Sequence, residues 1–582
     1  MRAAGTRELE STPAATPRPA GDPPSLFIDA VTTPADAPTN LSQPAGDERA
    51  DRSPSGALAP LGRLASDEWR AVAGWTLGAF LLRLLTNWGV EQAISPDGVY
   101  YVNAGRSLVA GNWGEGLSTY WPPLYPLLVG LSSLVFRDAE FAGRFVSVVA
   151  GALLVVPAYR LARAWYGRRA AGLSAALVAL HPLLVYYSTV LLTEATYTLL
   201  FACGVLAGWA ALSGRRARAH FAAGAIFGAC YLLKPEAAGF LALLLAPTLC
   251  EKLFDRRLSF KMSARNALTL CAGFLMLALP YLLYLRHETG AWTISGKLAA
   301  HRWQGGRRGA GALLALPPGT LVPDAATALV QMTKALRAEY EIFNLIFPTA
   351  FVLLAGLGLF RTRWTGERAR RELYLFSFVA AAFAGYAVTL PNIRFFVPLL
   401  PLLLCWAARG VVEFEGWAVE SLGGSRVARG FSPRAQKVVA PLVVAVLLAT
   451  MLPLAIYLLR GDKWGDYGGQ KRAAVWIAAQ AGTAPPVVMS TAPVAAFYAG
   501  GRHVQLVEED YAALVARARR EGVAYVVVNE RTVKRMNPLL PLLDGQAPHA
   551  GLRLAHTVAD APGHKILVYA LDGAHDAGAG AR

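Results

Sequence analysis

The chain has 582 residues, of which 54% are hydrophobic and only 16% are charged, and its formal net charge is +17. A soluble globular protein carries about 25% charged residues, so this composition argues against a soluble enzyme and for a chain that has lipid as its main solvent. The positive charge does not indicate a nucleic-acid partner, because the basic residues lie in short loops and form no stripe with aromatic residues.

The first 66 residues are rich in Pro, Ala, Thr and Asp and contain no apolar run, which predicts a disordered cytoplasmic tail without a cleavable signal peptide. Apolar runs long enough to cross roughly 30 Å of hydrocarbon then recur through residues 67–460. A further stretch, 121–136, is short and begins with two prolines, so we interpret it as an interfacial or re-entrant helix. We expect about eleven spans, at 69–90, 140–162, 170–188, 191–212, 219–233, 236–250, 265–285, 343–360, 373–390, 394–412 and 438–459.

Basic residues follow every second predicted span, which marks those connections as cytoplasmic by the positive-inside rule. The N-terminus is then inside, and two long loops, about 91–139 and 287–342, lie outside. The second outer loop breaks the rule, as long loops can, and its charge suggests an anionic partner. Its basic residues are Lys297, Arg302, Arg307, Arg308, Lys334 and Arg337.

The composition changes after the last span and predicts a small α/β domain over residues 461–572, outside the membrane. Strand signals occur at 487–489, 525–528 and 565–570, with an amphipathic helix at 511–521. Acceptor selection is one hypothesis for its role. Residues 573–582 are rich in Gly and Ala and are expected to be disordered. The predicted fold class is therefore mostly α: a polytopic membrane helix bundle of the inner (cytoplasmic) membrane followed by a small α/β domain.

Ionisable residues beside apolar runs are costly in lipid and therefore point to function. Asp97 lies in the first outer loop, and Glu194 begins the fourth span. Lys234 and Glu236 form a tight turn between two spans, and Arg394 begins the tenth. All five residues fall at the outer membrane level, so the topology predicts that they meet in one site.

Each of these residues also has a purely structural interpretation. Glu194 could pair with Lys234 and fix two helices together, and Arg394 could anchor its span at the interface. Asp97 belongs to a Pro-Asp-Gly sequence that is common in turns, and the basic residues of the second outer loop could contact only lipid headgroups. Each interpretation can explain one residue by itself. Together they explain less well why all of these ionisable residues fall at the same membrane level.

The order of several short motifs resembles a known family. Asp97, Tyr100 and Tyr101 in the first outer loop are followed by Trp-Pro-Pro-Leu-Tyr-Pro at 121–126 and Ala-Gly-Arg-Phe at 142–145. Then come Tyr-Gly-Arg-Arg at 166–169, His-Pro at 181–182, Leu-Thr-Glu at 192–194 and Leu-Lys-Pro-Glu at 233–236. This order resembles the membrane glycosyltransferases of the GT-C fold, in particular the protein O-mannosyltransferases and the lipid A aminoarabinose transferases (glycosyltransferase family 39-like).

The resemblance implies inverting transfer of a sugar from a polyprenyl-phosphate donor to a hydroxyl of a glycan, lipid or protein acceptor, at the outer face of the membrane. Asp97 would be the general base, and fixed cations would stabilise the leaving phosphate. The residues expected to bind substrate are Tyr100, Tyr101, Glu194, Lys234, Glu236, Arg302, Arg307, Arg308 and Arg394.

One departure from the family concerns metals. Many members have two adjacent acids in the first loop, whereas Asp97 is followed here by Gly98. No His/Asp cluster with metal spacing occurs elsewhere, so we expect no required cofactor, with a divalent metal as an open alternative.

An alternative function is a transporter or flippase of lipid-linked glycans, but the sequence has no internal repeat and its charges lie at the outer level rather than at the midplane. A non-catalytic scaffold would leave the charged residues unexplained.

Overall fold

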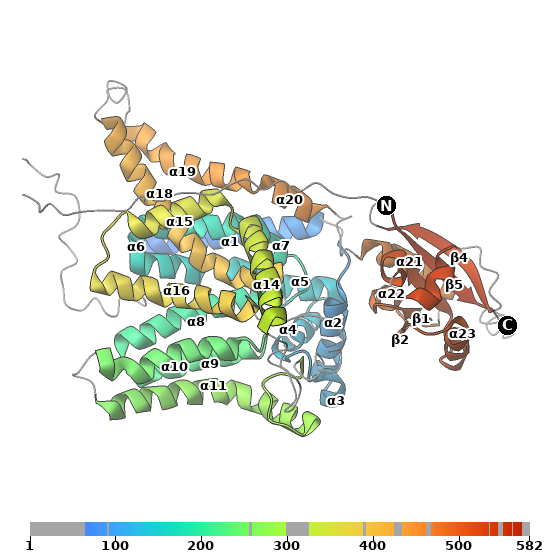
Figure 1. Cartoon of the computed structure of the whole chain (residues 1–582). Helices are drawn as coiled ribbons and strands as arrows, with labels where there is room; N and C mark the ends of the chain where they lie inside the picture. The colour runs from blue at the N-terminus through green and yellow to red at the C-terminus, as the bar shows by residue number, and fades with distance from the viewer. Residues whose placement is uncertain are drawn as a thin grey trace, which may run out of the picture. The chain divides into compact units, whose positions relative to one another are not determined.

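The structure is a computed structural model that describes residues 64–89, 92–254, 259–297, 325–387, 391–423, 433–460, 467–482, 484–534, 536–544, 551–560 and 563–572. Most of the described chain forms a bundle of helices (Figure 1). Its helices are α1 (Ser66–Gly89), α5 (Ala139–Leu153), α6 (Val155–Leu180), α7 (Pro182–Tyr187), α8 (Glu194–Gly214), α9 (Ala217–Tyr231), α10 (Ala237–Phe254), α11 (Phe260–Thr289), α14 (Ala325–Ile346), α15 (Thr349–Phe360), α16 (Gly366–Ala387), α18 (Leu400–Gly423), α19 (Pro433–Thr450) and α20 (Leu452–Leu459).

Each of the eleven predicted spans lies mainly on these helices, which confirms a polytopic helical membrane fold. By length and hydropathy, four helical segments of the described chain could each cross a membrane: Ala139–Leu180, Glu194–Gly214, Phe260–Thr289 and Ile393–Ser421. Two bent helix pairs, Met332–Ile346 with Thr349–Phe360 and Val438–Thr450 with Leu452–Leu459, raise the number to as many as six if each pair is counted as one span. The count of eleven therefore stays a prediction.

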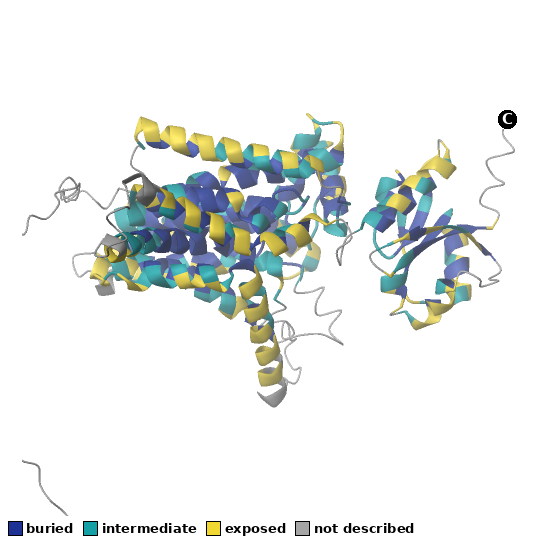
Figure 2. Ribbon diagram, turned by 90° about the horizontal axis from the view of Figure 1, so that it is seen from above, coloured by how far each residue is buried: buried dark blue, intermediate teal, exposed yellow. Residues whose placement is uncertain are grey.

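Helices of the bundle approach one another closely at glycines. A Cβ atom added to Gly224 on α9 would lie 2.0 Å from the carbonyl oxygen of Leu270 on α11, and one on Gly273 would lie 2.1 Å from that of Phe221. Small residues at helix crossings are typical of membrane proteins, where apolar burial alone does not hold helices together. Buried residues gather inside the bundle, while large apolar side chains such as Leu268, which is 71% exposed, lie on its surface (Figure 2). Such a surface suits contact with lipid.

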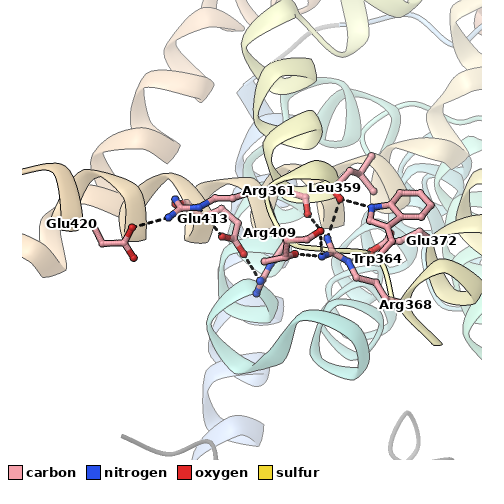
Figure 3. A network of polar contacts seen from close by, with 10 residues as sticks. Leu359, Arg361, Trp364, Arg368, Glu372, Arg409, Glu413 and Glu420 are labelled. Atoms are coloured by element: carbon pink, nitrogen blue, oxygen red, sulfur yellow. Dashed lines mark hydrogen bonds and ion pairs between the residues drawn. The ribbon is translucent and has the colours of Figure 1, made fainter. Parts of the chain in front are cut away.

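Figure 3 shows a polar network in which the connection between α15 and α16, predicted to be cytoplasmic, and the first turns of α16 meet α18. Contacts of the predicted turn at 166–169 extend this network. The predicted basic turn at 166–169 is present as a break in α6, where Gly167 has φ +83°. Tyr166 beside it donates a hydrogen bond of 2.7 Å to Glu372 on α16, and Trp406 Nε1 on α18 donates one of 2.8 Å to the same carboxylate oxygen.

The same network holds the end of α15 against α18. Arg361 pairs with Glu420 at 2.9 Å and with Glu413 at 3.5 Å (Figure 3). Arg370, in the same basic connection, lies over the ring of Trp209 near the C-terminal end of α8. Because α8 has 21 residues, its two ends are about 30 Å apart, roughly the thickness of the hydrocarbon core.

A group of shorter helices lies at the other end of α8: α2 (Pro96–Val109), α3 (Trp113–Gly116), α4 (Leu124–Ser133), α17 (Ile393–Phe396) and the 3-10 helix η2 (Val397–Leu399). α4 has only 10 residues, so the stretch predicted not to cross the membrane is short. α2 packs on α4 where Gly105 meets Gly130: a Cβ on Gly105 would lie 2.5 Å from the carbonyl oxygen of Pro126.

The C-terminal part is a five-stranded sheet with helices, as the sequence predicts. The strand order is β2-β1-β3-β5-β4, in which β1 pairs in parallel with β2 and β3, and β5 pairs in antiparallel fashion with β3 and β4. The strands are β1 (Val487–Ser490), β2 (Arg502–Gln505), β3 (Tyr525–Asn529), β4 (Leu552–Ala559) and β5 (Lys565–Leu571). The helical elements are α21 (Gly468–Ala481), α22 (Val494–Tyr498), α23 (Tyr511–Arg520), α24 (Glu530–Val533) and η4 (Asn537–Leu543).

Both faces of this sheet are covered, which explains the continuous apolar run of β3. Val526 and Val528 face a core shared with Leu514 on α23, whereas Tyr525 and Val527 face a second core, shared with α21 and α22. A central strand buried on both faces needs apolar residues at every position.

Candidate active site

Asp97 stands in the first turn of α2, whose start is fixed by its own sequence. Ser95 caps the helix by accepting a hydrogen bond of 3.2 Å from the amide of Gly98, and Pro96 occupies the first helical position. The Asp97 side chain is 30% exposed, and Arg394 Nη1 on α17 donates a hydrogen bond of 3.1 Å to its Oδ2. Two residues 297 positions apart in the sequence thus meet.

A second ion pair joins this one. Lys234 Nζ lies 3.1 Å from Glu194 Oε1, and these side chains are only 9% and 2% exposed. Arg394 Nε lies 4.0 Å from the same Glu194 oxygen, so four charges form a row in the order Asp97, Arg394, Glu194, Lys234. The pairing of Glu194 with Lys234 considered from the sequence is therefore present. It leaves Glu194 Oε2 buried without a hydrogen-bond partner among the described residues.

Aromatic rings surround the row of charges. The Lys234 ammonium lies 5.4 Å from the ring centres of both Tyr197 and Phe395, a favourable arrangement for a buried cation. Tyr101, four residues after Asp97, is buried and packs edge-on against Tyr125 at 5.0 Å. Tyr101 therefore supports α2.

Tyr100 faces a different neighbour from Tyr101. Its ring stacks on Trp121 at a centroid distance of 4.1 Å, and Tyr120 packs against the same indole at 4.5 Å. Burial raises the pKa of the Tyr120 phenol, and the Asp97 carboxylate raises it further. The Trp-Pro-Pro motif thus brings an aromatic wall close to the candidate base.

Lys297 joins the site from the second long loop, where it was noted as one of the basic residues but not among those expected to bind substrate. Its ammonium lies 5.0 Å from the ring centre of Tyr120, and the amide of Gly296 donates a hydrogen bond of 3.0 Å to the Thr119 carbonyl. Burial lowers the pKa of Lys297, while the nearby Glu236 carboxylate opposes this shift. The signal that could have found Lys297 was its positive charge on the predicted outer side.

The structure thus brings four of the charged residues predicted for the site into one row: Asp97, Arg394, Glu194 and Lys234. The fifth, Glu236, is close enough to Lys297 to act on its pKa. Arg302, Arg307 and Arg308 lie outside the described residues, so their part in substrate binding stays a prediction. Within the described ranges, no three His, Cys, Asp or Glu side chains are grouped as a metal site would need.

Gly98 has a structural reason for replacing a second acid. A Cβ atom at this position would lie 3.2 Å from the carbonyl oxygen of Leu191 and 3.2 Å from the Cβ of Ile94. Both distances are shorter than ordinary van der Waals contacts, so the start of α2 would have to shift to admit a larger residue.

Residues 121–296 match the family model described as dolichyl-phosphate-mannose-protein mannosyltransferase. No curated protein sequence matches the chain. Among solved structures, the chain is similar to ArnT from Cupriavidus metallidurans bound to undecaprenyl phosphate, with 16% identity and a TM-score of 0.54, over 88% of this chain and 99% of that one.

Two further structures come from Archaeoglobus fulgidus. Its oligosaccharyltransferase in the apo form is 14% identical, with a TM-score of 0.53, over 79% of this chain and 69% of that one. The archaeal oligosaccharyltransferase AglB in complex with an inhibitory peptide and a dolichol-phosphate is 13% identical, with a TM-score of 0.54, over 80% of this chain and 69% of that one.

These findings define the class of the protein: it is a polytopic membrane protein with the GT-C fold, and the resemblance expected from its sequence is confirmed. They agree with a membrane glycosyltransferase that uses a lipid-phosphate-linked donor. The matched segment contains Glu194, Lys234 and Glu236 but neither Asp97 nor Arg394. The geometry therefore adds two residues to the site independently of the family match.

Proposed function

We propose that this protein is an integral membrane glycosyltransferase that moves a sugar from a polyprenyl-phosphate donor to an acceptor hydroxyl. The reaction takes place at the outer face of the cytoplasmic membrane, with the N-terminus cytoplasmic and the C-terminal domain extracytoplasmic. The observation that carries the proposal is the row Asp97, Arg394, Glu194, Lys234, in which four distant segments place a carboxylate beside fixed cations.

Asp97 acts as the general base. A hydroxyl is a weak nucleophile until a positioned carboxylate accepts its proton. The acceptor oxygen attacks the anomeric carbon on the face opposite the phosphate, the bond from that carbon to the phosphate oxygen breaks, and the configuration is inverted. The phosphate leaves with the bonding electron pair.

The three cations of the site stabilise this leaving group. Negative charge grows on the phosphate oxygen as the glycosidic bond breaks, so cations fixed beforehand stabilise the transition state more than the ground state. Arg394 can bind phosphate with two parallel hydrogen bonds, and Lys234 and Lys297 add point charges. Lys234 and Lys297 come from separate loops, which allows the phosphate to lie between them.

Arg394 also links donor binding to the state of the base. It pairs with Asp97 in the structure, and a donor phosphate would compete for the same guanidinium. Donor binding therefore weakens the ion pair and leaves the Asp97 carboxylate available for the acceptor proton. This order protects the base until the donor is in place.

The proposed reaction needs no divalent metal, because Lys234, Lys297 and Arg394 already supply positive charge to the phosphate. The chelator EDTA should leave the transfer rate unchanged. A rate that falls with EDTA and returns with added Mg²⁺ or Mn²⁺ would contradict this part of the proposal.

The test is transfer of radiolabelled sugar by the purified protein from a panel of polyprenyl-phosphate sugars. Asp97→Asn should lower the rate by about 10²- to 10⁴-fold while donor binding is retained. The matched control is Glu115→Gln, which changes an acid on α3 in the same predicted outer loop, hydrogen-bonded to Ser107, and should transfer at the wild-type rate.

Each outcome of this test has a clear meaning. Wild-type activity in Asp97→Asn would reject Asp97 as the base but keep the enzyme. An absence of transfer by the wild type with every donor, beside a working positive control, would overturn the proposed function, and lipid flipping in vesicles would be measured next.

A further inference from the structure

The four residues before α2 are held from several sides. The Gln92 carbonyl accepts a hydrogen bond from Arg144 on α5, and the Gln92 side chain donates one of 3.2 Å to the carbonyl of Leu458 on α20. The amide of Ile94 donates one of 2.9 Å to the hydroxyl of Tyr498. Asp97 follows three residues later, so whatever fixes segment 92–95 also fixes the candidate base.

Tyr498 belongs to the C-terminal domain, at the end of α22. While its hydroxyl accepts from Ile94, it donates a hydrogen bond of 2.8 Å to Glu140 Oε2 on α5. Lys471 on α21 lies 3.6 Å from the same carboxylate oxygen and 4.8 Å from the centre of the Tyr498 ring. Two residues of the domain therefore converge on one carboxylate of the bundle.

Glu140 connects this contact with the other anchor of segment 92–95. Its second oxygen pairs with Arg144, the residue that donates to the Gln92 carbonyl. The hydrogen bonds to Gln92 and to Ile94 thus depend on the same carboxylate. Burial raises the pKa of Tyr498, and the charge of Glu140 raises it further, so the phenol keeps the proton that it donates.

The helix that carries Tyr498 is itself fixed on two sides. Val494 is fully buried in the core of the bundle, whereas its neighbour Ala495 is fully buried in the core between the sheet and α21. Tyr467, just before α21, also packs on the bundle core. Burial raises the pKa of Tyr467, and the Asp97 carboxylate raises it further. The domain therefore reaches the neighbourhood of Asp97 through more than one residue.

We propose that the C-terminal domain positions the candidate base, with Tyr498 as the positioning residue that holds segment 92–95 and thereby the start of α2. The inference rests on the proposed function, in which Asp97 accepts the acceptor proton. A base must lie within hydrogen-bond reach of that proton, and a small displacement of a reacting group lowers the rate far more than it lowers binding. The domain thus has a role in the chemical step as well as any role in choosing the acceptor.

The test compares Tyr498→Phe with Tyr569→Phe in the full-length protein. Both variants lose one tyrosine hydroxyl of the same domain, but Tyr569 donates to the Leu542 carbonyl at 2.6 Å, inside the domain. Tyr498→Phe should lower kcat by about 10- to 100-fold and leave KM for the donor within about twofold. Tyr569→Phe should leave both unchanged.

Hydrogen–deuterium exchange provides a readout that does not depend on activity. Exchange of the amides of Ile94, Ser95, Asp97 and Gly98 should become faster in Tyr498→Phe, because the Ile94 amide loses its acceptor, and should be unchanged in Tyr569→Phe. A variant that merely loosened the domain would speed exchange in the sheet strands as well.

A double-mutant cycle tests whether Tyr498 acts through Glu140. If Tyr498 acts through its hydrogen bond to Glu140, Tyr498→Phe combined with Glu140→Gln should lower kcat no further than the more damaging single change. If the fold losses in kcat of the two single variants multiply in the double variant, the two residues act independently and the coupling through Glu140 is overturned. Unchanged exchange at residues 94–98, or faster exchange with unchanged kcat, would overturn the positioning role.

Failure of this inference and failure of the proposed function are distinguishable. A wild-type protein that transfers no sugar contradicts the proposed function, whatever the exchange shows. A wild-type protein that transfers sugar, beside a Tyr498→Phe variant with normal exchange and normal kcat, contradicts only the inference.

Discussion

Replacing Lys234 separates a structural role of this lysine from a role in binding the donor. Lys234 and Glu194 are 9% and 2% exposed, with 3.1 Å between their charged atoms. Removing one partner of a buried pair costs about 3–5 kcal/mol, because the other charge stays buried and unpaired. Arg394 remains 4.0 Å from the same carboxylate and compensates in part, so we expect Lys234→Met to destabilise the fold by about 2–3 kcal/mol.

The double variant Lys234→Met with Glu194→Gln removes both charges and should recover most of this loss, since uncharged replacements of a buried pair are often nearly neutral. Transfer should not recover, because the donor phosphate has still lost a cation. The assay pairs the thermal unfolding midpoint, followed by tryptophan fluorescence in one detergent, with the initial transfer rate. A double variant with wild-type stability and wild-type transfer would refute the binding role and leave the pair as a helix lock. An unchanged midpoint in Lys234→Met alone would refute the burial argument.

Three further predictions follow from the packing and the charges. Gly224→Ala should lower the unfolding midpoint strongly, because its Cβ would meet the Leu270 carbonyl oxygen at 2.0 Å; Gly239→Ala, whose Cβ has no described atom within 4 Å, should leave the midpoint unchanged or raise it slightly. Gly98→Ala should lower the transfer rate clearly but the unfolding midpoint only slightly. The new Cβ would meet a backbone carbonyl oxygen at 3.2 Å and move the start of α2, which carries Asp97. Burial lowers the pKa of Lys297. A lysine is charged only below its pKa, so KM for the donor should rise with pH earlier than an ordinary lysine would allow, and Lys297→Arg should remove this dependence.

The helices could be predicted from the sequence because an apolar run of span length has few other uses. The bends were harder to foresee. Residues 343–360 were predicted as one span, but α14 and α15 meet there at 88°. Pro348, directly before α15, was the available signal, because a proline disfavours a helical conformation at the residue before it.

The strands could likewise be predicted only where their own residues carry a clear apolar pattern. β3 could be predicted because all five of its residues are buried and the first four are aromatic or apolar. β2 could not, because only one of its four residues, Val504, is buried. Its pairing with β1 is decided by the rest of the sheet and leaves little trace in its own sequence.

The site divides in a similar way. Asp97, Glu194, Lys234 and Arg394 could be found because a charge beside hydrocarbon is expensive, so its presence in the sequence demands an explanation. The topology then placed the four charges at one level, and the structure brings them into contact. Tyr498 carries no such signal. A tyrosine is an ordinary residue in a domain that contains many polar residues, so nothing in the sequence marks it. The amide from which it accepts a hydrogen bond lies 404 positions earlier in the chain. Sequence reasoning therefore finds the residues that chemistry makes costly, whereas the residues that hold them in place become visible only from the contacts of the fold.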